Sequence, residues 1–185
     1  MRRIQPIQIA QADVKSKQLL EGVQRGLGMI PNLVKTMAQS PAALAGYLNF
    51  NQALGDALNP PLREQISLVV AGINGCSYCA SAHCAIGGKA GIDKGELTAN
   101  LQGRSQDGKT QAALQFARDV VEKRGMVSDE DLGSVRAAGY TDRQIIEIIA
   151  MVALNIFTNY FNNVAETEID FPLVDVAGQV SAPAR

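Results

Sequence analysis

The 185-residue chain is long enough for one domain with a substantial core, since a chain of this size buries about 70% of the surface it exposes when unfolded. Its net charge of −1 excludes the basic footprint of a nucleic-acid-binding protein, and its apolar and charged fractions of 46% and 19% are typical of globular proteins. Three cysteines within nine residues argue against a secreted disulfide framework and favour a catalytic or metal-binding group in a reducing compartment.

Helical signals follow one another along the chain, and no segment shows the alternation of a β-strand. A helical pattern over residues 16–36 is interrupted by two glycines and a proline. Asn59-Pro60-Pro61 places a capping side chain before a first-turn proline. Ser128 with Asp131 is close to a capping box. The further predicted helices cover residues 42–58, 62–73, 76–86, 93–100, 110–124, 128–139 and 141–166.

These signals predict an all-α fold organised as one domain over residues 1–185. Its core is expected at about 40–170, with a peripheral N-terminal arm at 1–15 and a peripheral C-terminal tail at 171–185. The longest apolar run, residues 145–157, is shorter than the roughly 18 residues a membrane span needs, and it contains Glu147. The N-terminus has no apolar signal-peptide region, so we expect a cytoplasmic protein without a membrane segment.

A short internal similarity indicates that the chain could be built from two similar halves. A shift of 79 residues aligns segment 65–71, which contains Gln65-Ile66 and Val69-Val70-Ala71, with segment 144–150. If the similarity continues, each redox group of the first half pairs with a polar residue of the second: Cys76 with Asn155, Cys79 with Thr158, and His83 with Asn162.

The segment from Cys76 to His83 holds the residues best suited to chemistry. At 100° per residue, Cys79 lies about 60° and His83 about 20° around the helix from Cys76, so all three share one face. Cysteines at i and i+3 of a helix N-terminus can form a disulfide, and Cys79 and His83 at i and i+4 are neighbours.

Glu64 is expected beside His83. If helices 62–73 and 76–86 fold back on each other about Asn74-Gly75, residue 64 faces the region of residues 84 and 85. A carboxylate beside an imidazole favours the imidazolium, which in turn favours a cysteine thiolate. The order Glu64, His83, cysteine therefore predicts a proton relay.

These residues resemble a known family. Glu64, eleven residues, Cys76-x-x-Cys79, three residues and His83 are similar to the pattern of the alkylhydroperoxidase D-like branch of the carboxymuconolactone decarboxylase family. The runs Gly139–Ala150 and Asn163–Glu166 also resemble that family. The resemblance covers roughly residues 40–170.

The resemblance implies a compact all-helical domain of the alkylhydroperoxidase D-like type that forms a homo-oligomer: a trimer or hexamer, with a dimer as the alternative. It implies reduction of alkyl hydroperoxides through a sulfenic acid at Cys79, which Cys76 resolves to a disulfide, with Glu64 and His83 as the relay. A lipoyl- or thioredoxin-like protein would supply an external dithiol. The sequence has no flavin or nicotinamide fingerprint, so no cofactor is expected.

The residues alone leave the order of the two cysteines open. The positive helix N-terminus favours a low pKa at Cys76, whereas the proximity of His83 favours Cys79. Family members with a full relay also carry a second histidine inside the CxxC, where this chain has Tyr78. We expect Tyr78 to point away from the thiols and to serve in packing, with a subunit boundary as one place for it.

Several alternatives remain at this point. The cysteines could form an inert buried pair or ligate zinc with His83 and either Cys84 or Glu64, although a closed tetrahedral site is awkward because Cys84 points about 100° away from His83. Cys84 otherwise fits packing. The helical stripe Asn155, Asn159, Asn162 could be a solvated face, an interface or a pocket wall. A carboxymuconolactone decarboxylase-like enzyme and a non-catalytic redox sensor are the alternative functions.

Overall fold

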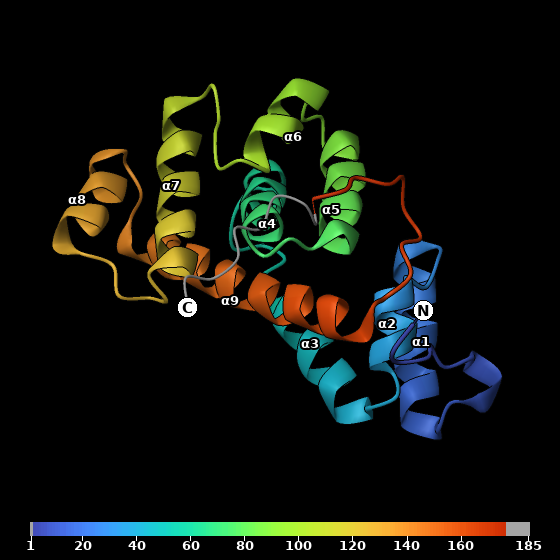
Figure 1. Ribbon diagram of the computed structural model, residues 1–185. Coiled ribbons are helices and arrows are strands. Elements are labelled where there is room, and N and C mark those ends of the chain that lie inside the picture. The colour runs from blue at the N-terminus through green and yellow to red at the C-terminus, as the bar shows by residue number, and fades with distance from the viewer. Residues whose placement is uncertain (1, 177–185) are drawn as a thin grey trace, which may run out of the picture.

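The computed structural model describes residues 2–176, and within them it contains helices and loops but no β-strand (Figure 1). The all-α prediction is therefore confirmed. The elements in chain order are a 3₁₀ helix η1 (Ile9–Gln11) and helices α1 (Val14–Leu27), α2 (Asn32–Met37), α3 (Pro41–Ala53), α4 (Pro60–Ile73), α5 (Ser77–Lys89), α6 (Lys94–Asn100), α7 (Gly108–Glu122), α8 (Asp129–Ala137) and α9 (Asp142–Ala165).

Helix α4 lies at the centre of the molecule, and α5, α6, α7 and α9 pack around it (Figure 1). Its residues 65–72 are buried without interruption, as expected for a helix that is covered on all sides. Gly72 allows the chain after α6 to approach closely, because a Cβ at this position would lie 2.0 Å from the carbonyl oxygen of Leu101. Because four helices pack around α4, they fix the position of Glu64 on this helix.

The helix starts follow the predicted capping signals. Asn59 Oδ1 accepts a hydrogen bond from the Leu62 amide at 2.9 Å, directly before the two prolines that open α4. Ser128 and Asp131 form a reciprocal capping box at α8. The predicted 16–36 helix is instead two helices, because α1 ends at Gly28 and the chain resumes a helix only after Pro31.

The packed core extends on both sides of the predicted 40–170 segment. A second apolar cluster beside α5 includes Leu20 of α1, Leu33 of α2 and Val176 of the tail, all buried. Residues 171–176 of the predicted peripheral tail thus contact the body of the protein, while 177–185 lie outside the described residues.

Helix α9 is the one described helix that is long and apolar enough to cross a membrane, yet it packs against α4 and α7. Its inward side buries ten residues, among them Ile148, Val152 and Asn159. Its outward side exposes five large apolar residues at helical spacing: Ile146, Ile149, Phe157, Tyr160 and Val164. α9 is therefore a core helix with an apolar outer stripe.

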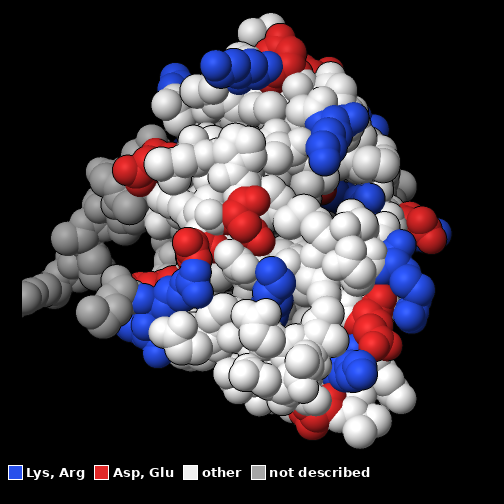
Figure 2. Space-filling model, turned by 90° about the vertical axis from the view of Figure 1, so that its right-hand side faces the viewer, with Lys and Arg blue, Asp and Glu red and all other residues white. Residues whose placement is uncertain are grey.

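Charges of both signs are scattered over the face that carries the N-terminal helices, and no large patch of one sign covers it (Figure 2). This face matches the near-neutral net charge of −1.

Candidate functional site

The two cysteines lie at the N-terminus of α5, directly after a tight turn. Gly75 adopts a φ of +60°, a left-handed conformation that glycine tolerates best, and the turn lets α5 fold back along α4. Cys76 is the N-cap residue of α5, and its sulfur accepts a hydrogen bond from the Cys79 amide at 3.4 Å. Both thiols are free and buried. Cys76 and Cys79 therefore meet at the first turn, as the i, i+3 spacing predicts.

Glu64 and His83 lie together between α4 and α5. Glu64 Oε2 is 2.7 Å from His83 Nδ1, and the two side chains are only 14% and 23% exposed. Burial disfavours the imidazolium, but the carboxylate beside it outweighs burial and raises the pKa of His83 above 6.5. The antiparallel packing of the two helices, which the sequence predicts, thus brings this pair together.

Asn162 of α9 completes the surroundings of Cys79. Its Nδ2 donates a hydrogen bond to the Cys79 sulfur at 3.2 Å. Burial opposes ionisation of this thiol, but hydrogen bonds from Cys76 and Asn162 and the charge of His83 outweigh it. The pKa of Cys79 therefore falls from 9.0 to about 7.

Cys76 has the opposite tendency. The hydrogen bond that its thiol donates to the Cys79 sulfur raises the pKa of Cys76 far above 9.0, and burial raises it further. The position of Cys76 at the helix N-terminus does not compensate, although the helix dipole alone favours this cysteine. The contacts of Asn162 and His83 with Cys79 thus favour Cys79 as the more acidic thiol.

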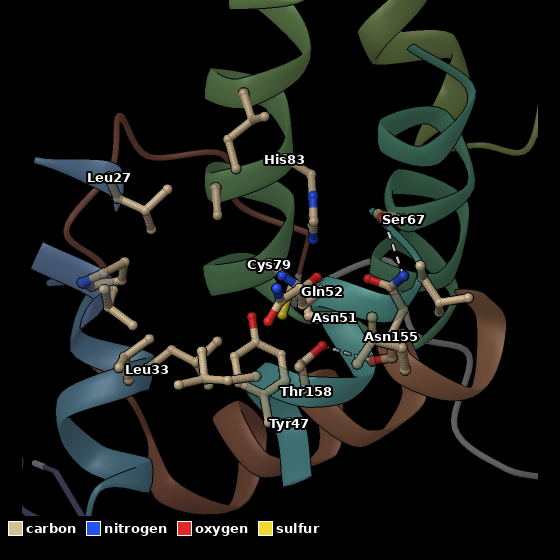
Figure 3. Close-up of a pocket in the computed structure, with 18 of the residues that line it drawn as sticks. Leu27, Leu33, Tyr47, Asn51, Gln52, Ser67, Cys79, His83, Asn155 and Thr158 are labelled. Carbon is tan, nitrogen blue, oxygen red and sulfur yellow. Dashed lines mark hydrogen bonds between the residues drawn. The ribbon is translucent and has the colours of Figure 1, made fainter. Parts of the chain in front are cut away.

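A cavity of about 750 Å³ opens beside Cys79 and His83, between α5, α9 and the N-terminal helices α1–α3 (Figure 3). Cys79 and His83 line it, whereas Cys76 and Cys84 do not. The Tyr47 hydroxyl points toward Cys79 across the cavity (Figure 3). Burial and the nearby charges of Cys79 and Glu64 raise the pKa of Tyr47 to about 12, so this hydroxyl stays a proton donor. Of the two thiols at the start of α5, Cys79 is therefore the one that a molecule in the cavity can contact.

Tyr78 packs within the chain. Its hydroxyl donates a hydrogen bond to Asp170 at 2.8 Å and accepts one from the Leu33 amide at 3.1 Å, and its ring meets Phe171 edge-on. Burial raises the pKa of Tyr78 well above its usual range. Tyr78 therefore ties α2 and the tail to α5, as the expected packing role requires.

The polar stripe of α9 is a buried wall of this site. Asn155, Asn159 and Asn162 are each at most 3% exposed. Asn155 Nδ2 donates to Ser67 of α4 at 3.0 Å, and Asn159 accepts from Asn74 at 3.1 Å. The stripe was visible in the sequence, but its orientation toward Cys79 was not. Tyr47 and Arg63 of the cavity wall were missed: no spacing relates Tyr47 to the cysteines, and the position of Arg63 beside Glu64 was the one signal that could have found it.

The zinc alternative gains no support from this geometry. In the part of the chain that the structure describes, no three His, Cys, Asp or Glu side chains are grouped so that they could hold a metal ion. Cys84 is half-buried against the apolar cluster beside α5, which fits its packing role.

Comparisons with known proteins agree with this fold. Residues 41–123, from the start of α3 to the end of α7, match the carboxymuconolactone decarboxylase family. A peroxidase-related protein with an alkylhydroperoxidase AhpD core, from Ralstonia eutropha JMP134, superposes with a TM-score of 0.83 at 23% identity, over 91% of this chain and 92% of that one. A comparison with curated proteins finds no match.

Two further solved structures share the fold. A peroxidase-related protein from Silicibacter sp. TM1040 has a TM-score of 0.77 at 23% identity, over 90% of this chain and 92% of that one. A variant of the debrominase Bmp8 in complex with 2,3,4-tribromopyrrole has a TM-score of 0.77 at 20% identity, over 92% of each chain. The segment that matches the carboxymuconolactone decarboxylase family contains Glu64, Cys76, Cys79 and His83, and the chain has the fold of a protein with an alkylhydroperoxidase AhpD core.

Proposed function

We propose that the protein is a thiol-dependent peroxidase that reduces organic hydroperoxides at Cys79. One observation carries the proposal: the thiol with the lowered pKa faces the cavity, and a second thiol and a His–Glu pair stand beside it. An ionised thiol that lines a cavity large enough for an organic peroxide is the nucleophile that peroxide reduction needs.

The first step consumes the peroxide. The Cys79 thiolate attacks the distal oxygen of the hydroperoxide, the O–O bond breaks, and Cys79 becomes a sulfenic acid. The alkoxide that leaves takes a proton from the imidazolium of His83, which Glu64 keeps charged and oriented. The Tyr47 hydroxyl is placed to donate a hydrogen bond to the same oxygen.

The second step uses Cys76. Its thiol attacks the sulfenic sulfur of Cys79, a disulfide forms, and water leaves. Each cycle thus removes two electrons from the cysteine pair. An external dithiol, of the lipoyl or thioredoxin type, restores the two thiols by disulfide exchange.

The test is oxidation of the reduced protein by one equivalent of cumene hydroperoxide, with site-resolved mass spectrometry. Wild type is expected to form a Cys76–Cys79 disulfide, and Cys76→Ser is expected to accumulate sulfenic acid at Cys79. Cys84→Ser is the matched control, because Cys84 does not line the cavity, and it should behave as wild type. Unreacted thiols in the wild type would refute the peroxidase.

Reductive debromination is a second candidate, because the Bmp8 debrominase has the same fold. The same two thiols would supply two electrons, so that a carbon–bromine bond becomes carbon–hydrogen, bromide leaves and the disulfide forms. Release of bromide from tribromopyrrole by the reduced wild type, together with loss of two thiols, would favour this reaction over peroxide reduction.

Self-association is also part of the proposal. The exposed apolar stripe of α9, defined above by Ile146, Ile149, Phe157, Tyr160 and Val164, supports a homo-oligomer, because exposed apolar helix faces of this kind pair with partners. Light scattering of the purified chain measures the number of copies.

A further inference from the structure

Arg63 is a charged side chain in the cavity wall without an ionic partner. One of its nitrogens, Nη1, donates to the carbonyl oxygen of Leu54 at 3.3 Å, while Nε is buried and has no hydrogen-bond partner. Throughout residues 2–176, no carboxylate comes within ion-pair distance of it, since the adjacent Glu64 is engaged by His83. The cavity thus contains an uncompensated guanidinium.

A guanidinium in this position favours an anion. Withdrawing a guanidinium from water without a partner is unfavourable. Its planar fork matches a carboxylate, which it binds through two parallel hydrogen bonds. A carboxylate on a bound ligand would therefore satisfy donors that the protein itself leaves unused.

The rest of the cavity suits an apolar body. Much of its wall comes from aliphatic side chains of the N-terminal helices, including Leu19, Val23, Leu27 and Leu33. At about 750 Å³ the cavity is far larger than hydrogen peroxide requires and falls in the range of about 300–1,000 Å³ that accommodates organic ligands.

Arg63 and Cys79 are separated along the helices. The Glu64–His83 contact sets the register of α4 against α5, and His83 lies one turn after Cys79. With a rise of 1.5 Å per residue, Arg63 stands about 6–8 Å farther along the helix pair than the thiol. One ligand can therefore place its charge at Arg63 and its reacting group at Cys79.

We infer that this cavity selects amphipathic organic hydroperoxides that carry a carboxylate, with Arg63 as the residue that binds the carboxylate while the hydroperoxide reaches Cys79. This inference rests on the proposed peroxidase function and assigns its substrate class. Fatty-acid hydroperoxides have this chemistry: an apolar chain, a terminal carboxylate and a hydroperoxide partway along the chain.

The test compares linoleic acid hydroperoxide with its methyl ester, which differs only in charge. The wild type should oxidise with a kcat/KM about 10-fold or more higher for the acid, since a hydrogen bond to a charged group contributes about 1.5–3 kcal/mol. Arg63→Gln should bring the acid-to-ester ratio close to 1, mainly through KM, and Arg63→Lys should restore part of it. Arg143→Gln, which removes an exposed arginine on α9, is the matched control and should keep the wild-type ratio.

A second measurement separates this inference from the peroxidase proposal. Decanoate, which cannot react, should raise the melting temperature of the wild type more than decanol does, and Arg63→Gln should abolish the difference. An acid-to-ester ratio near 1 in the wild type, or one that survives in Arg63→Gln, would overturn the inference. If neither hydroperoxide oxidises Cys79, the peroxidase fails, and the decanoate result alone decides whether Arg63 binds carboxylates.

Discussion

Helices α5 and α9 approach the Cys79 sulfur from two sides with different chemistry. α5 supplies groups that gain or lose protons, namely the two thiols and His83, whereas α9 supplies the amide of Asn162. An amide donates a hydrogen bond but does not titrate near neutral pH. The comparison teaches that the amide that donates to the Cys79 sulfur and the side chains that can exchange protons with it lie on two different helices.

The short internal similarity relates α4, rather than α5, to the first part of α9. Segment 65–71 lies in α4 and segment 144–150 in α9, and these helices pack on each other. α4 ends at the turn before Cys76, whereas α9 continues as one helix through the corresponding residues. Asn155 therefore lies within a helix, while its counterpart Cys76 caps one. The break between α4 and α5 therefore places Cys76 and Cys79 at a helix N-terminus, and the corresponding part of α9 has no such terminus.

Replacement of His83, the imidazole on α5, should have the largest effect on the rate of Cys79 oxidation. His83→Gln keeps a hydrogen-bond donor toward Glu64 but cannot exchange protons, so the rate of Cys79 oxidation by cumene hydroperoxide should fall about 10²- to 10⁴-fold. Stopped-flow measurement of thiol loss gives this rate. A loss below 10-fold would assign the proton transfer to another group.

The pH dependence should follow the thiolate. Because the pKa of Cys79 is lowered from 9.0 to about 7, its thiolate fraction and its alkylation rate should rise about 50-fold from pH 5 to pH 7 and level off above. The raised pKa of His83 keeps the imidazolium charged through and beyond pH 6.5, so no opposing transition is expected below that pH. Site-resolved iodoacetamide labelling measures the midpoint, and a midpoint near 9 would contradict the lowered pKa.

Loss of the amide on α9 should act on the pKa alone. Asn162→Leu removes a hydrogen bond to a charged sulfur, worth about 1.5–3 kcal/mol, and should raise the pKa of Cys79 by about 1–2 units. The labelling midpoint should move accordingly. Asn163→Ala is the control, because that neighbouring amide donates to the Asn74 carbonyl oxygen and not to the thiol. Equal midpoints in both variants would show that α9 does not tune the thiol.

Tyr78→Phe should change stability rather than chemistry. It leaves the buried Leu33 amide without its acceptor and removes one of the hydrogen bonds that Asp170 accepts, which should lower the free energy of unfolding by about 1–3 kcal/mol. Urea unfolding measures this change, and Tyr160→Phe on the exposed side of α9 should stay within about 0.5 kcal/mol. A 100-fold loss of peroxide reactivity in Tyr78→Phe would instead place Tyr78 in the proton relay.

Short sequence signals were enough to predict the start of α4 and the contact between Glu64 and His83. Asn59 with its two prolines located the start of α4, and the turn at Asn74-Gly75 placed Glu64 beside His83. Both depend on neighbours within one helical hairpin. Asn162 lies 83 residues from Cys79, and the packing that brings them together involves the whole core.

The order of the cysteines and the walls of the cavity needed the structure for the same reason. The pKa of Cys79 depends on a hydrogen bond from α9, and the helix-dipole rule could not include that contact. Asp13, whose carboxylate caps α1, was overlooked, and with it the extent of the helix that forms one wall of the cavity.

The sulfur cap of α5 has a consequence for protein engineering. Serine, threonine, asparagine and aspartate are the preferred N-cap residues, and their oxygens accept a backbone N–H better than the sulfur of Cys76 does at 3.4 Å. Cys76→Ser should therefore raise the unfolding free energy of the reduced protein by about 0.5–1 kcal/mol, which urea unfolding would measure. A lower value would show that thiol packing outweighs the cap. Cys76, which we propose as the residue that resolves the sulfenic acid, is thus one that a search for thermostable variants would replace, and the more robust protein would then lose the proposed turnover.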